Sequence, residues 1–516
     1  MKIETQVLVI GGGLTGAGVL RDLAMRGVEA LLVERRDINA GASGANHGLL
    51  HSGARYAHTD PTSARECVLE NAKLKRVASA CIDPCGGLFV SLDGDDEDYP
   101  RALLDSAARI GLEVEQVDPA EVLAEEPYLN RDIRAVLRVP DAAINPFMAT
   151  IANLRAATDL GARVLLHSQV ISMERRGDRI VKVEAIRSTD GERVEIFPEQ
   201  VVSAAGPWVD QIGALAGVEI PIAYSKGSLL ITNSRLVNRV INRLRPPCDG
   251  DIIVPGETVT ITGTTSIRVD NLDHLSTPAA EVDLLVAEAA KVLPAMADSR
   301  YIRVYAGVRP LVLDRSGSGD RAISRSFTVF DHERDDLGNL VTVAGGKLTT
   351  FRLMAEKVVD LVCRRLNSDA TCRTADVPLP GSEQGASLDA ADRLRRLQVP
   401  APEGEVICEC EMIGKAQVEE LVDALAVEGQ PISLNALRLR SRQGMGSCQG
   451  GFCGFRSTGL LYDKGIVSGK QGNSMLCDFL EKRWGGIKPV LWGEQLRQEQ
   501  LLEAIYCGSL NIDGDL

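Results

Sequence analysis

Short apolar runs alternate with helically spaced apolar residues in the first part of the chain. The runs at Gln6–Ile10 and Glu29–Val33 are typical of buried parallel strands. Between them, a stretch rich in alanine and leucine predicts a helix that continues to about Arg26 and ends at Gly27. The order of strand, glycine turn and helix start returns at Leu340–Thr350. Strands alternating with helices predict an α/β fold built on a parallel sheet.

Two further groups of strands show the patterns of antiparallel sheets. The first group is predicted to form a β-meander that leads into a strand and a glycine at Gln200–Trp208, and its members are Val164–Ile171, Ile180–Ile186 and Arg193–Ile196. The second group consists of Lys226–Thr232, Asp251–Pro255 and Thr258–Gly263. We expect the second group to form a separate antiparallel sheet that covers a ligand.

The last quarter of the chain is predicted to be helical. Proline- and glycine-rich stretches at Val377–Ala386 and Pro400–Gly404 mark boundaries before it. Apolar residues at helical spacing predict helices at Lys415–Glu428 and Leu434–Arg442, and an amphipathic helix around Glu494–Tyr506. These helices predict a small helical domain and a tail, which either docks a partner subunit or packs on its own domain.

Composition and charge narrow the class of protein. The chain has 516 residues, of which 45% are hydrophobic and 25% charged, and this mix is ordinary for soluble globular domains. The net charge of −14 argues against nucleic acid as a partner. No run approaches the ~20 apolar residues of a membrane span, and the N-terminal residues lack the pattern of a signal peptide. We therefore expect a cytoplasmic protein whose contact with a membrane is peripheral.

The first strand ends in a glycine motif that is suited to a dinucleotide. Gly11, Gly13 and Gly16 fit G-x-G-x-x-G, which permits a tight turn, close approach of the backbone to a pyrophosphate, and close packing of the helix on the sheet. The helix N-terminus favours the anion. Glu34 follows the second strand, where a carboxylate accepts hydrogen bonds from a ribose.

The nucleotide-binding part is assembled from separated pieces, which favours an extended FAD over NAD. We expect FAD-binding parts at about 1–60, 146–219 and 306–375, with substrate-domain parts at about 61–145 and 220–305. The whole region 1–375 is then a flavin-dependent oxidoreductase, followed by a linker at 376–403, a metal-binding domain at 404–470 and a helical tail at 471–516. The predicted fold class is α/β, with a Rossmann-like FAD-binding domain, an antiparallel-sheet substrate domain and a small α-helical domain.

Four of the twelve cysteines form two tight pairs with glycines nearby. Cys408 and Cys410 are spaced C-x-C, and Cys448 and Cys453 are spaced C-x₄-C. Four thiolates suit zinc, but C-x-C is unusual for a zinc knuckle. The glycines allow backbone N–H groups to approach cluster sulfurs, and an upstream flavin needs a one-electron outlet. The pattern therefore favours a [2Fe-2S] cluster over zinc.

The motifs together resemble those of the FAD-dependent glycerol-3-phosphate dehydrogenases, among the D-amino-acid-oxidase-like flavoproteins. The resemblance covers about the first 365 residues and rests on Gly11–Gly16, Asn46–Tyr56, Ala205–Trp208, Lys226–Ser228, Tyr305–Pro310 and Gly345–Arg352. The C-terminal part is similar to the large catalytic subunit of the anaerobic, membrane-associated form. That form carries a [2Fe-2S] domain homologous to bacterioferritin-associated ferredoxin, and the similarity extends to Lys488–Arg497 and Glu503–Tyr506.

The resemblance implies oxidation of sn-glycerol 3-phosphate to dihydroxyacetone phosphate, with hydride transfer to FAD. Arginine suits a phosphate dianion, so Arg309 and Arg325 are the candidate phosphate ligands. His51 is the candidate base, with His47 and Arg55 as rivals for handling the proton. Arg55 and Lys347 are suited to hold the substrate oxygen or to stabilise the flavin anion.

The resemblance implies further contacts and partners. Tyr56 is implied as a substrate contact. The implied flavin contacts, besides the glycine motif and Glu34, are Ser43, His47, Gly48, Leu49, Val170, Ala205, Gly206, Trp208, Gly346, Leu348 and Thr349. Electrons are expected to pass to two partners, a second subunit of flavoprotein type and an iron–sulfur subunit that anchors the complex in the membrane. From there they are expected to reach the quinone pool at the inner face of the cell membrane.

Two other functions fit the same pattern. One is a flavin and iron–sulfur dehydrogenase of an amino acid, an opine or a 2-hydroxy acid, for which a carboxylate clamp needs one arginine. The other is a non-catalytic flavin and iron–sulfur relay. The three cations Arg309, Arg325 and Lys347 favour a doubly charged phosphate over a carboxylate.

Overall fold

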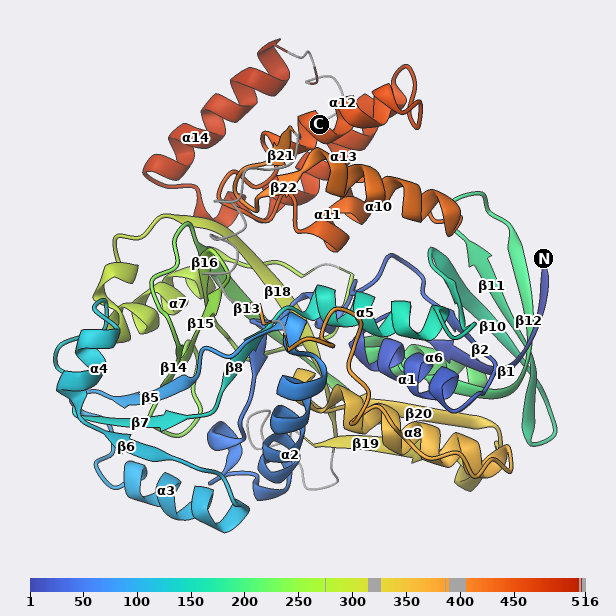
Figure 1. Ribbon diagram of the computed structural model, residues 1–516, viewed down its shortest axis with the longest axis horizontal. Helices are drawn as coiled ribbons and strands as arrows, with labels where there is room; N and C mark the ends of the chain where they lie inside the picture. Colours follow the sequence, from blue (N-terminus) through green and yellow to red (C-terminus); the bar gives the residue numbers. More distant parts are fainter. Residues whose placement is uncertain (274, 314–325, 386, 389–404, 510–511, 513–516) are drawn as a thin grey trace.

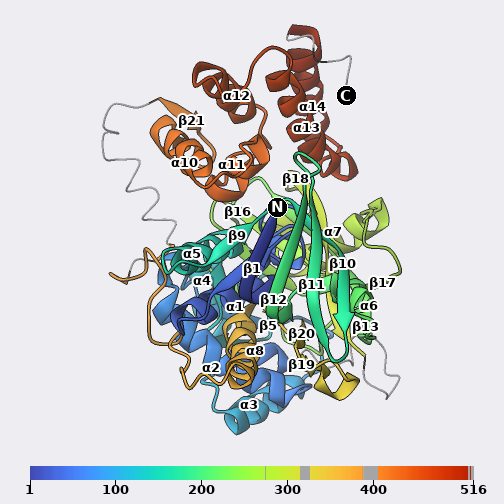
Figure 2. The same ribbon diagram turned by 90° about the vertical axis from the view of Figure 1, so that its right-hand side faces the viewer.

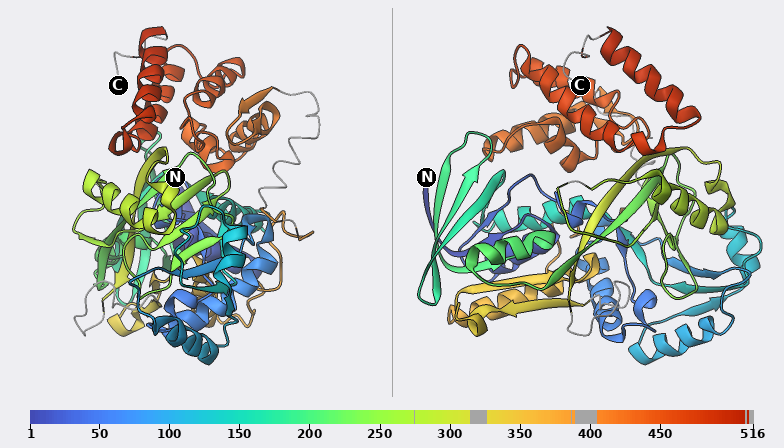
Figure 3. Two further views of the ribbon diagram at one scale, coloured as in Figure 1. Left: turned by 90° about the vertical axis from the view of Figure 1, so that its left-hand side faces the viewer. Right: turned by 180° about the vertical axis from the view of Figure 1, so that it is seen from behind.

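The computed structural model describes residues 1–273, 275–313, 326–385, 387–388, 405–509 and 512. Two large sheets lie next to each other, and the helices of the C-terminal region lie above both of them (Figure 1). Views from the sides and from behind show the same stacking (Figures 2 and 3). The predicted α/β fold with a second, mainly antiparallel sheet is confirmed.

The first sheet is the predicted parallel sheet with its antiparallel meander. Its strands are β1 (Lys2–Ile10), β2 (Ala30–Val33), β9 (Arg163–Leu165), β10 (Ser168–Arg176), β11 (Arg179–Arg187), β12 (Arg193–Ser203), β19 (Phe327–Asp331) and β20 (Leu340–Gly345). β1 pairs in parallel with both β12 and β2, and β20 pairs in parallel with β12. The three segments that supply these strands are far apart in the sequence, as the predicted assembly from separated pieces requires.

Helices α1 (Leu14–Met25), α5 (Pro146–Thr158) and α8 (Phe351–Arg365) cover one face of this sheet, and α6 (Val209–Ala216) packs with the meander on the other face. Val7 and Val9 pack with α1, α5 and α8, whereas Leu8 and Ile10 pack with α6 and the meander. Successive side chains of a strand point to opposite faces, so a continuous apolar run buries both faces of β1.

Two predictions of strand boundaries are wrong. The runs at Arg193–Ile196 and from Gln200 were predicted as separate strands, but they form the single strand β12. The segment Val164–Ile171 was expected to be a single strand of the meander, but it contains the end of β9 and the start of β10. His167 lies between them with a φ of 54°, in the left-handed region, and its backbone N–H donates to Arg36 O. The chain therefore leaves the parallel sheet at His167 and enters the meander as a new strand.

The second sheet is mainly antiparallel. Its strands are β5 (Gly87–Ser91), β6 (Glu115–Val117), β7 (Ala135–Val139), β13 (Ile222–Thr232), β14 (Val240–Arg243), β15 (Ile252–Gly256), β16 (Val259–Gly263), β17 (Ile267–Val269) and β18 (Tyr301–Val312). β13 and β18 form the longest pairing in the described residues, and β14 pairs in parallel with β5. The associated helices are α2 (Pro61–Val77), α3 (Tyr99–Ile110), α4 (Pro119–Glu125) and α7 (Ala279–Val292).

A small sheet lies at the junction of the two large ones. It consists of β3 (Leu49–Leu50), β4 (Ile82–Asp83) and β8 (Ala142–Ile144). β3 belongs to the segment that leads from β2 of the first sheet to β5 of the second sheet, and it pairs with β8. This pairing fixes the loop that carries His47 and His51 between the two halves of the molecule.

The C-terminal region contains the predicted helices. Its elements are β21 (Val406–Cys408), β22 (Ile413–Gly414), α10 (Lys415–Val427), α11 (Leu434–Ser441), α12 (Cys453–Asp463), α13 (Gln471–Gly485) and α14 (Glu494–Glu503). They share one hydrophobic cluster, which includes Leu437, Leu461 and Leu480. The residues after α13 pack on the rest of the chain, because Ile487 and Val490 are buried with Val304 and Leu88 in the core of the second sheet.

Candidate functional site

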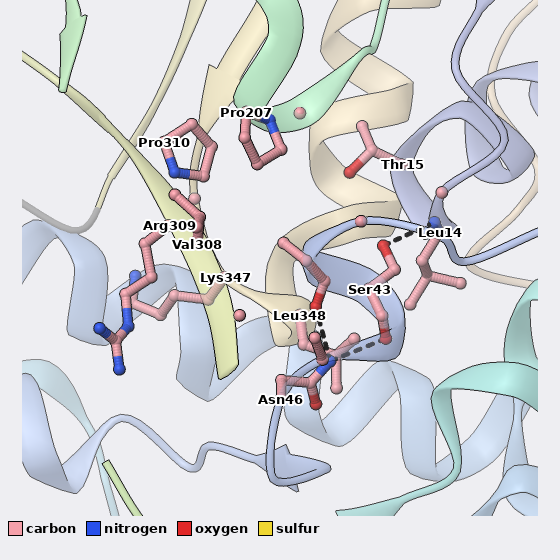
Figure 4. A pocket seen from close by; sticks show the side chains of 18 of the residues that line it. Leu14, Thr15, Ser43, Asn46, Pro207, Val308, Arg309, Pro310, Lys347 and Leu348 are labelled. Atoms are coloured by element: carbon pink, nitrogen blue, oxygen red, sulfur yellow. Dashed lines mark hydrogen bonds between the residues drawn. The ribbon is translucent and has the colours of Figure 1, made fainter. Parts of the chain in front are cut away.

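The glycine motif forms a tight turn between β1 and α1. Gly11 has a φ of 118°, and a Cβ there would lie 2.5 Å from Ala204 O. A Cβ on Gly16 would lie 1.9 Å from Gly11 O, so the helix is packed directly against the turn. Ser43 Oγ accepts a hydrogen bond from Leu14 N at 2.9 Å and holds the next loop against the start of α1 (Figure 4).

Glu34 lies where the second strand ends, beside the turn. Its Oε2 accepts from Gly12 N at 2.7 Å, and its Oε1 accepts from Arg36 N at 2.8 Å. These bonds orient the carboxylate toward the cavity that Glu34 also lines. Nearby, the Arg35 guanidinium stacks on the Trp208 ring, with Cζ 4.0 Å from the ring centroid.

A cavity of about 1240 Å³ extends from the glycine turn to the second sheet. It is lined by most of the predicted site residues: Gly11, Gly13, Glu34, Ser43, His47, Leu49, His51, Arg55, Tyr56, Val170, Ala205, Gly206, Trp208, Arg309, Gly346, Lys347 and Leu348. Three other predicted residues, Gly16, Gly48 and Thr349, are not part of this lining but adjoin lining residues in the chain or in space. Thr349 Oγ1, for example, accepts from His51 N at 2.9 Å. Arg325 lies outside the described residues.

The cavity suits an FAD molecule. The glycine turn leaves space beside the N-terminus of α1, which favours a pyrophosphate. Glu34 provides a carboxylate at the end of the second strand, the place where a dinucleotide-binding fold holds a ribose. Among the described residues, the Trp208 Nε1 donor is buried without a hydrogen-bond partner, so a polar ligand atom would satisfy it.

Two cationic side chains reach the far end of the cavity. Arg309 from β18 and Lys347, which follows β20, extend away from Ser43 and the start of α1 (Figure 4). Arg309 donates to Thr265 O at 3.3 Å and to Thr264 Oγ1. Lys347 Nζ donates to Ser63 Oγ at 2.8 Å and lies 4.8 Å from the centroid of the Tyr56 ring. The far end of the cavity therefore contains two positive charges, each held in place by polar neighbours.

The two histidines of the loop differ in what their rings contact. His47 Nδ1 accepts a hydrogen bond from Leu49 N at 3.1 Å, so the proton of the neutral His47 ring is on Nε2. The described residues contain no hydrogen-bond partner for the His51 ring, which lines the cavity 5.2 Å from the Tyr56 ring, centroid to centroid. Of the two, His51 has the ring nitrogens that are available to a ligand.

Both histidines are held neutral. Burial lowers the pKa of His47 to about 3, helped by the charges of Arg309 and Arg55. Burial also lowers the pKa of His51 well below 6.5, and His47, Arg55 and Lys347 lower it further. A neutral imidazole can accept a proton, which is the state required of a general base.

Arg55 forms an ion pair with a carboxylate. Its Nη2 lies 3.2 Å from Asp251 Oδ2, and the Asp251 side chain is fully buried. Asp251 also bonds Arg245 and Cys248 N. Arg55 therefore lines the cavity as half of an ion pair.

The sequence did not indicate the residues that hold these cations. Ser63 lies at the start of α2, Asp251 before β15, and Thr264 after β16. Each is separated from its partner by dozens to hundreds of residues, and none belongs to a recognisable motif. Only the tertiary structure brings them to the cations that they hold.

The four cysteines of the C-terminal region associate in two cross-pairs. The Cys408 side chain hydrogen-bonds with Cys453, and that of Cys410 with Cys448. These contacts lower the pKa of Cys408 and lower that of Cys410 to about 5, and raise the pKa values of Cys453 and Cys448. In the part of the chain that the structure describes, no three His, Cys, Asp or Glu side chains are gathered as one metal-binding group.

Comparisons with known proteins place this site in a family. Residues 6–361 match the family model described as FAD dependent oxidoreductase. The chain is 40% identical to the A subunit of the anaerobic glycerol-3-phosphate dehydrogenase of Haemophilus influenzae, over 99% of this chain and 94% of that protein. It is 39% identical to the A1 subunit of the anaerobic enzyme of Haloferax volcanii, over 100% of this chain and 92% of that protein.

Solved structures show the same fold. A glycerol-3-phosphate dehydrogenase from Bacillus halodurans, complexed with FAD, matches with a TM-score of 0.65 and 21% identity, over 95% of this chain and 96% of that one. L-proline dehydrogenase from P. horikoshii matches with a TM-score of 0.58 and 20% identity, over 71% of this chain and 95% of that one. At full-length identities near 40%, the chain belongs to the FAD-dependent oxidoreductases, within the family of the anaerobic glycerol-3-phosphate dehydrogenase A subunits.

Proposed function

We propose that this protein oxidises sn-glycerol 3-phosphate to dihydroxyacetone phosphate, with FAD as the hydride acceptor and a [2Fe-2S] cluster as the electron outlet. The observation that carries the proposal is the cavity beside the glycine turn, which combines Arg309 and Lys347 with the neutral His51. The full-length relatives named as glycerol-3-phosphate dehydrogenase subunits support the choice of substrate.

Arg309 and Lys347 are assigned to the anionic substrate. A guanidinium donates two parallel hydrogen bonds to phosphate oxygens, and an ammonium adds a point charge. The Thr264 and Thr265 contacts fix the direction of the Arg309 side chain before the substrate arrives. This preorganisation reduces the side-chain entropy that is lost on binding.

His51 is assigned to the hydroxyl proton. Bound FAD would supply the acceptor for the hydride that leaves the carbinol carbon. The His51 ring accepts the proton, and the hydrogen bond between His51 N and Thr349 Oγ1 holds the backbone of the loop in place. Lys347 and the Arg55–Asp251 pair supply the electrostatic field around the developing alkoxide.

Anaerobic bleaching of the flavin is the experiment that tests the proposal. Under nitrogen, sn-glycerol 3-phosphate is expected to bleach the flavin absorbance of the oxidised protein. Three compounds serve as controls: glycerol lacks the phosphate group, and L-lactate and L-proline carry a carboxylate instead of it. None of them is expected to bleach the flavin at comparable concentrations. Bleaching by lactate or proline alone would establish the carboxylate-substrate alternative, and bleaching by dithionite alone would establish the electron relay.

The depressed pKa of His51 predicts the acid limb of the pH profile. A base with a lowered pKa stays deprotonated, and therefore active, until the pH falls below that value. At saturating substrate, the rate of flavin reduction is expected to stay constant from about pH 8 down to pH 6.5, the ordinary pKa of histidine. The rate is expected to fall only below pH 6.5. Stopped-flow measurement of the limiting rate checks this, because saturation removes the effect of the substrate phosphate titrating near pH ~6. A half-maximal rate at about 6.5 would contradict the assignment.

Gly227 provides a subtle test of the phosphate site. A Cβ on Gly227 would lie 2.5 Å from Arg309 Nη2, so Gly227→Ala is expected to push the guanidinium aside. Loss of about one hydrogen bond, or ~1.5 kcal/mol, corresponds to a roughly tenfold lower kcat/KM, mainly through KM. Steady-state kinetics measure the change. The matched control is Gly459→Ala, where a Cβ meets nothing within 4 Å and kinetics are expected to stay unchanged.

The four cysteines fit a thiolate-bound cluster. Backbone N–H groups contact every one of the four sulfurs. The N–H groups of Glu411 and Gly444 contact Cys408, and that of Gly444 also contacts Cys453. The N–H group of Cys448 contacts Cys410, and those of Gly450 and Phe452 contact Cys448. A Cβ on Gly446 would lie 2.2 Å from Cys410 Cβ, so glycine is required beside that ligand. Such N–H donors stabilise thiolates and tune cluster potentials.

Removing one cysteine is expected to separate the two half-reactions. Cys410→Ser should lose the cluster, since it removes one of four thiolate ligands. Turnover with an external one-electron acceptor is expected to fall by about tenfold or more, whereas bleaching of the flavin by substrate continues. Iron analysis and electron paramagnetic resonance measure the cluster. Cys67→Ser, which changes a buried cysteine of α2, is the control that should retain it.

Electrons are then proposed to leave to partner subunits at a membrane surface. Phe452 and Phe455 flank Cys453 and are 49% and 50% exposed, which supports a contact surface beside the cluster. The described helices include none with the length and apolar character needed to cross a membrane. The proposal assigns the membrane anchor and the quinone contact to other subunits, one iron–sulfur and one flavoprotein-type.

A further inference from the structure

An excess of arginines lies where the C-terminal region contacts the rest of the molecule. The five side chains are Arg303, Arg438, Arg440, Arg442 and Arg483. The carboxylates among them are Asp37, which pairs with Arg440, and Glu257 and Glu411, which both pair with Arg442. Three carboxylates therefore face five guanidiniums, and two positive charges remain.

The other three arginines have only neutral acceptors within the described residues. Arg303 donates to the carbonyl oxygens of residues 482 and 483, Arg438 donates to Asn435 Oδ1, and Arg483 donates to Gln449 Oε1. Arg483 is only 6% exposed, and its Nε is buried without a hydrogen-bond partner in that same set. Buried charge of one sign is costly unless an anion lies close by.

The electrostatics point to the cysteines as that anion. Burial lowers the pKa of Arg483 well below its ordinary value, and Arg303 and Arg438 lower it further, whereas Cys453 and Cys448 oppose the lowering. Burial likewise lowers the pKa of Arg438 to about 10, with Arg303 contributing. Arg483 Nη2 also donates to Gln449 Oε1, and Gln449 follows Cys448 in the chain, so the guanidinium lies beside the loop that carries two of the four proposed cluster ligands.

Strand β18 connects this arginine group to the flavin cavity. Arg303 lies near the start of β18, under the C-terminal region, where Val304 N donates to Gly486 O at 2.8 Å. Arg309 lies on the same face of the strand and lines the cavity, about 20 Å further along at ~3.3 Å per residue. Between them, the Tyr305 hydroxyl donates to the carbonyl of Asn46, another cavity residue. The charges of Arg303, Arg438 and Arg483 therefore lie closer to the four cysteines than to the flavin cavity.

We propose that Arg303, Arg438 and Arg483 raise the reduction potential of the cluster and so draw electrons from the reduced flavin toward the C-terminal region. This inference rests on the proposed cluster. A four-thiolate [2Fe-2S] centre is a dianion when oxidised, and one electron from the flavin adds a further negative charge. Nearby guanidiniums stabilise the more negative, reduced form in a low-dielectric interior. The three arginines act as positioning charges and bind no substrate.

A potentiometric titration followed by electron paramagnetic resonance tests the proposal on the full-length protein. Arg483→Gln is expected to disfavour reduction of the cluster at least tenfold, which is a fall of about 59 mV in the midpoint of a one-electron couple. Arg438→Gln and Arg303→Gln are expected to lower the midpoint by less. Arg483→Lys keeps the charge and is expected to restore most of the potential.

Arg456→Gln is the matched control. Arg456 also senses the charges of Cys408 and Cys453, but it is 38% exposed and paired with Glu409, so solvent and the carboxylate screen it. The midpoint potential of the cluster in Arg456→Gln is expected to equal that in the unmodified protein. The proposal is overturned if the midpoint potentials of Arg483→Gln and Arg438→Gln equal that of the unmodified protein. It is also overturned if Arg456→Gln lowers the midpoint potential as much as Arg483→Gln does.

Other outcomes separate this inference from the proposed function. If Arg483→Gln retains no cluster, as judged by iron content, Arg438→Gln and Arg303→Gln decide the result. Zinc in place of iron overturns the cluster and this inference together. A shifted midpoint in a protein whose flavin is not bleached by sn-glycerol 3-phosphate overturns the substrate assignment and leaves the role of the arginines standing.

Discussion

Replacing His51 with alanine is expected to slow flavin reduction by sn-glycerol 3-phosphate about 10²- to 10⁴-fold, the usual contribution of a positioned general base. The His51 ring lines the cavity, and burial together with His47, Arg55 and Lys347 keeps its pKa low, so it is neutral and ready to accept a proton. FAD content is expected to stay unchanged, because the glycine turn and Glu34 are untouched. Stopped-flow absorbance at saturating substrate measures the limiting rate.

His47→Ala is the matched control for this prediction. His47 lies in the same loop, but Leu49 N donates to its Nδ1, so the lone pair that would take a proton is already occupied. We expect a smaller loss of rate in His47→Ala than in His51→Ala. The reverse order would transfer the role of the base to His47.

Replacing Arg309 with glutamine is expected to lower kcat/KM for sn-glycerol 3-phosphate about 10²- to 10⁴-fold. Two hydrogen bonds to a charged phosphate contribute roughly 1.5–3 kcal/mol each, and glutamine retains neither the fork nor the charge. Arg309 lines the cavity and is held by Thr264 and Thr265, and for this reason it is the phosphate contact that we propose. Steady-state kinetics with an external acceptor measure the loss.

Arg134→Gln is the control, because Arg134 is an exposed arginine beside β7 of the same sheet and pairs only with Asp93 among the described residues. Its kinetics are expected to match those of the unmodified protein. An Arg309→Gln variant with unchanged KM and kcat would remove Arg309 from the substrate site and weaken the assignment of a phosphate substrate.

Local patterns predicted the nucleotide-binding half well. The β1 run, the glycine turn and Glu34 lie close in sequence, and their spacing alone specifies how they meet in space. The same is true of the helices α10 and α11, whose apolar positions have helical spacing. The error at Val164–Ile171 has a local cause that the sequence hides, since a left-handed residue at His167 divides an apolar run that reads as continuous.

Long-range partners were beyond the reach of the sequence. Nothing near Arg55 indicates Asp251, and nothing near Lys347 indicates Ser63, because each contact depends on how the two sheets face each other. The cross-pairing of Cys408 with Cys453 is similar, since four cysteines admit several pairings. The sequence therefore predicted which residue types gather at the site more completely than it predicted how they are held.

The burial of Ile487 and Val490 in the core of the second sheet has a consequence for synthesis of the protein. This core also contains Leu88 and Val304, which leave the ribosome much earlier than the residues that cover them. Until about residue 490 has emerged, the apolar face of the sheet stays partly open, and exposed apolar surface on a nascent chain promotes aggregation. Completion of the core of the second sheet is therefore a late event, and chaperones that shield apolar surface are expected to matter most in that interval.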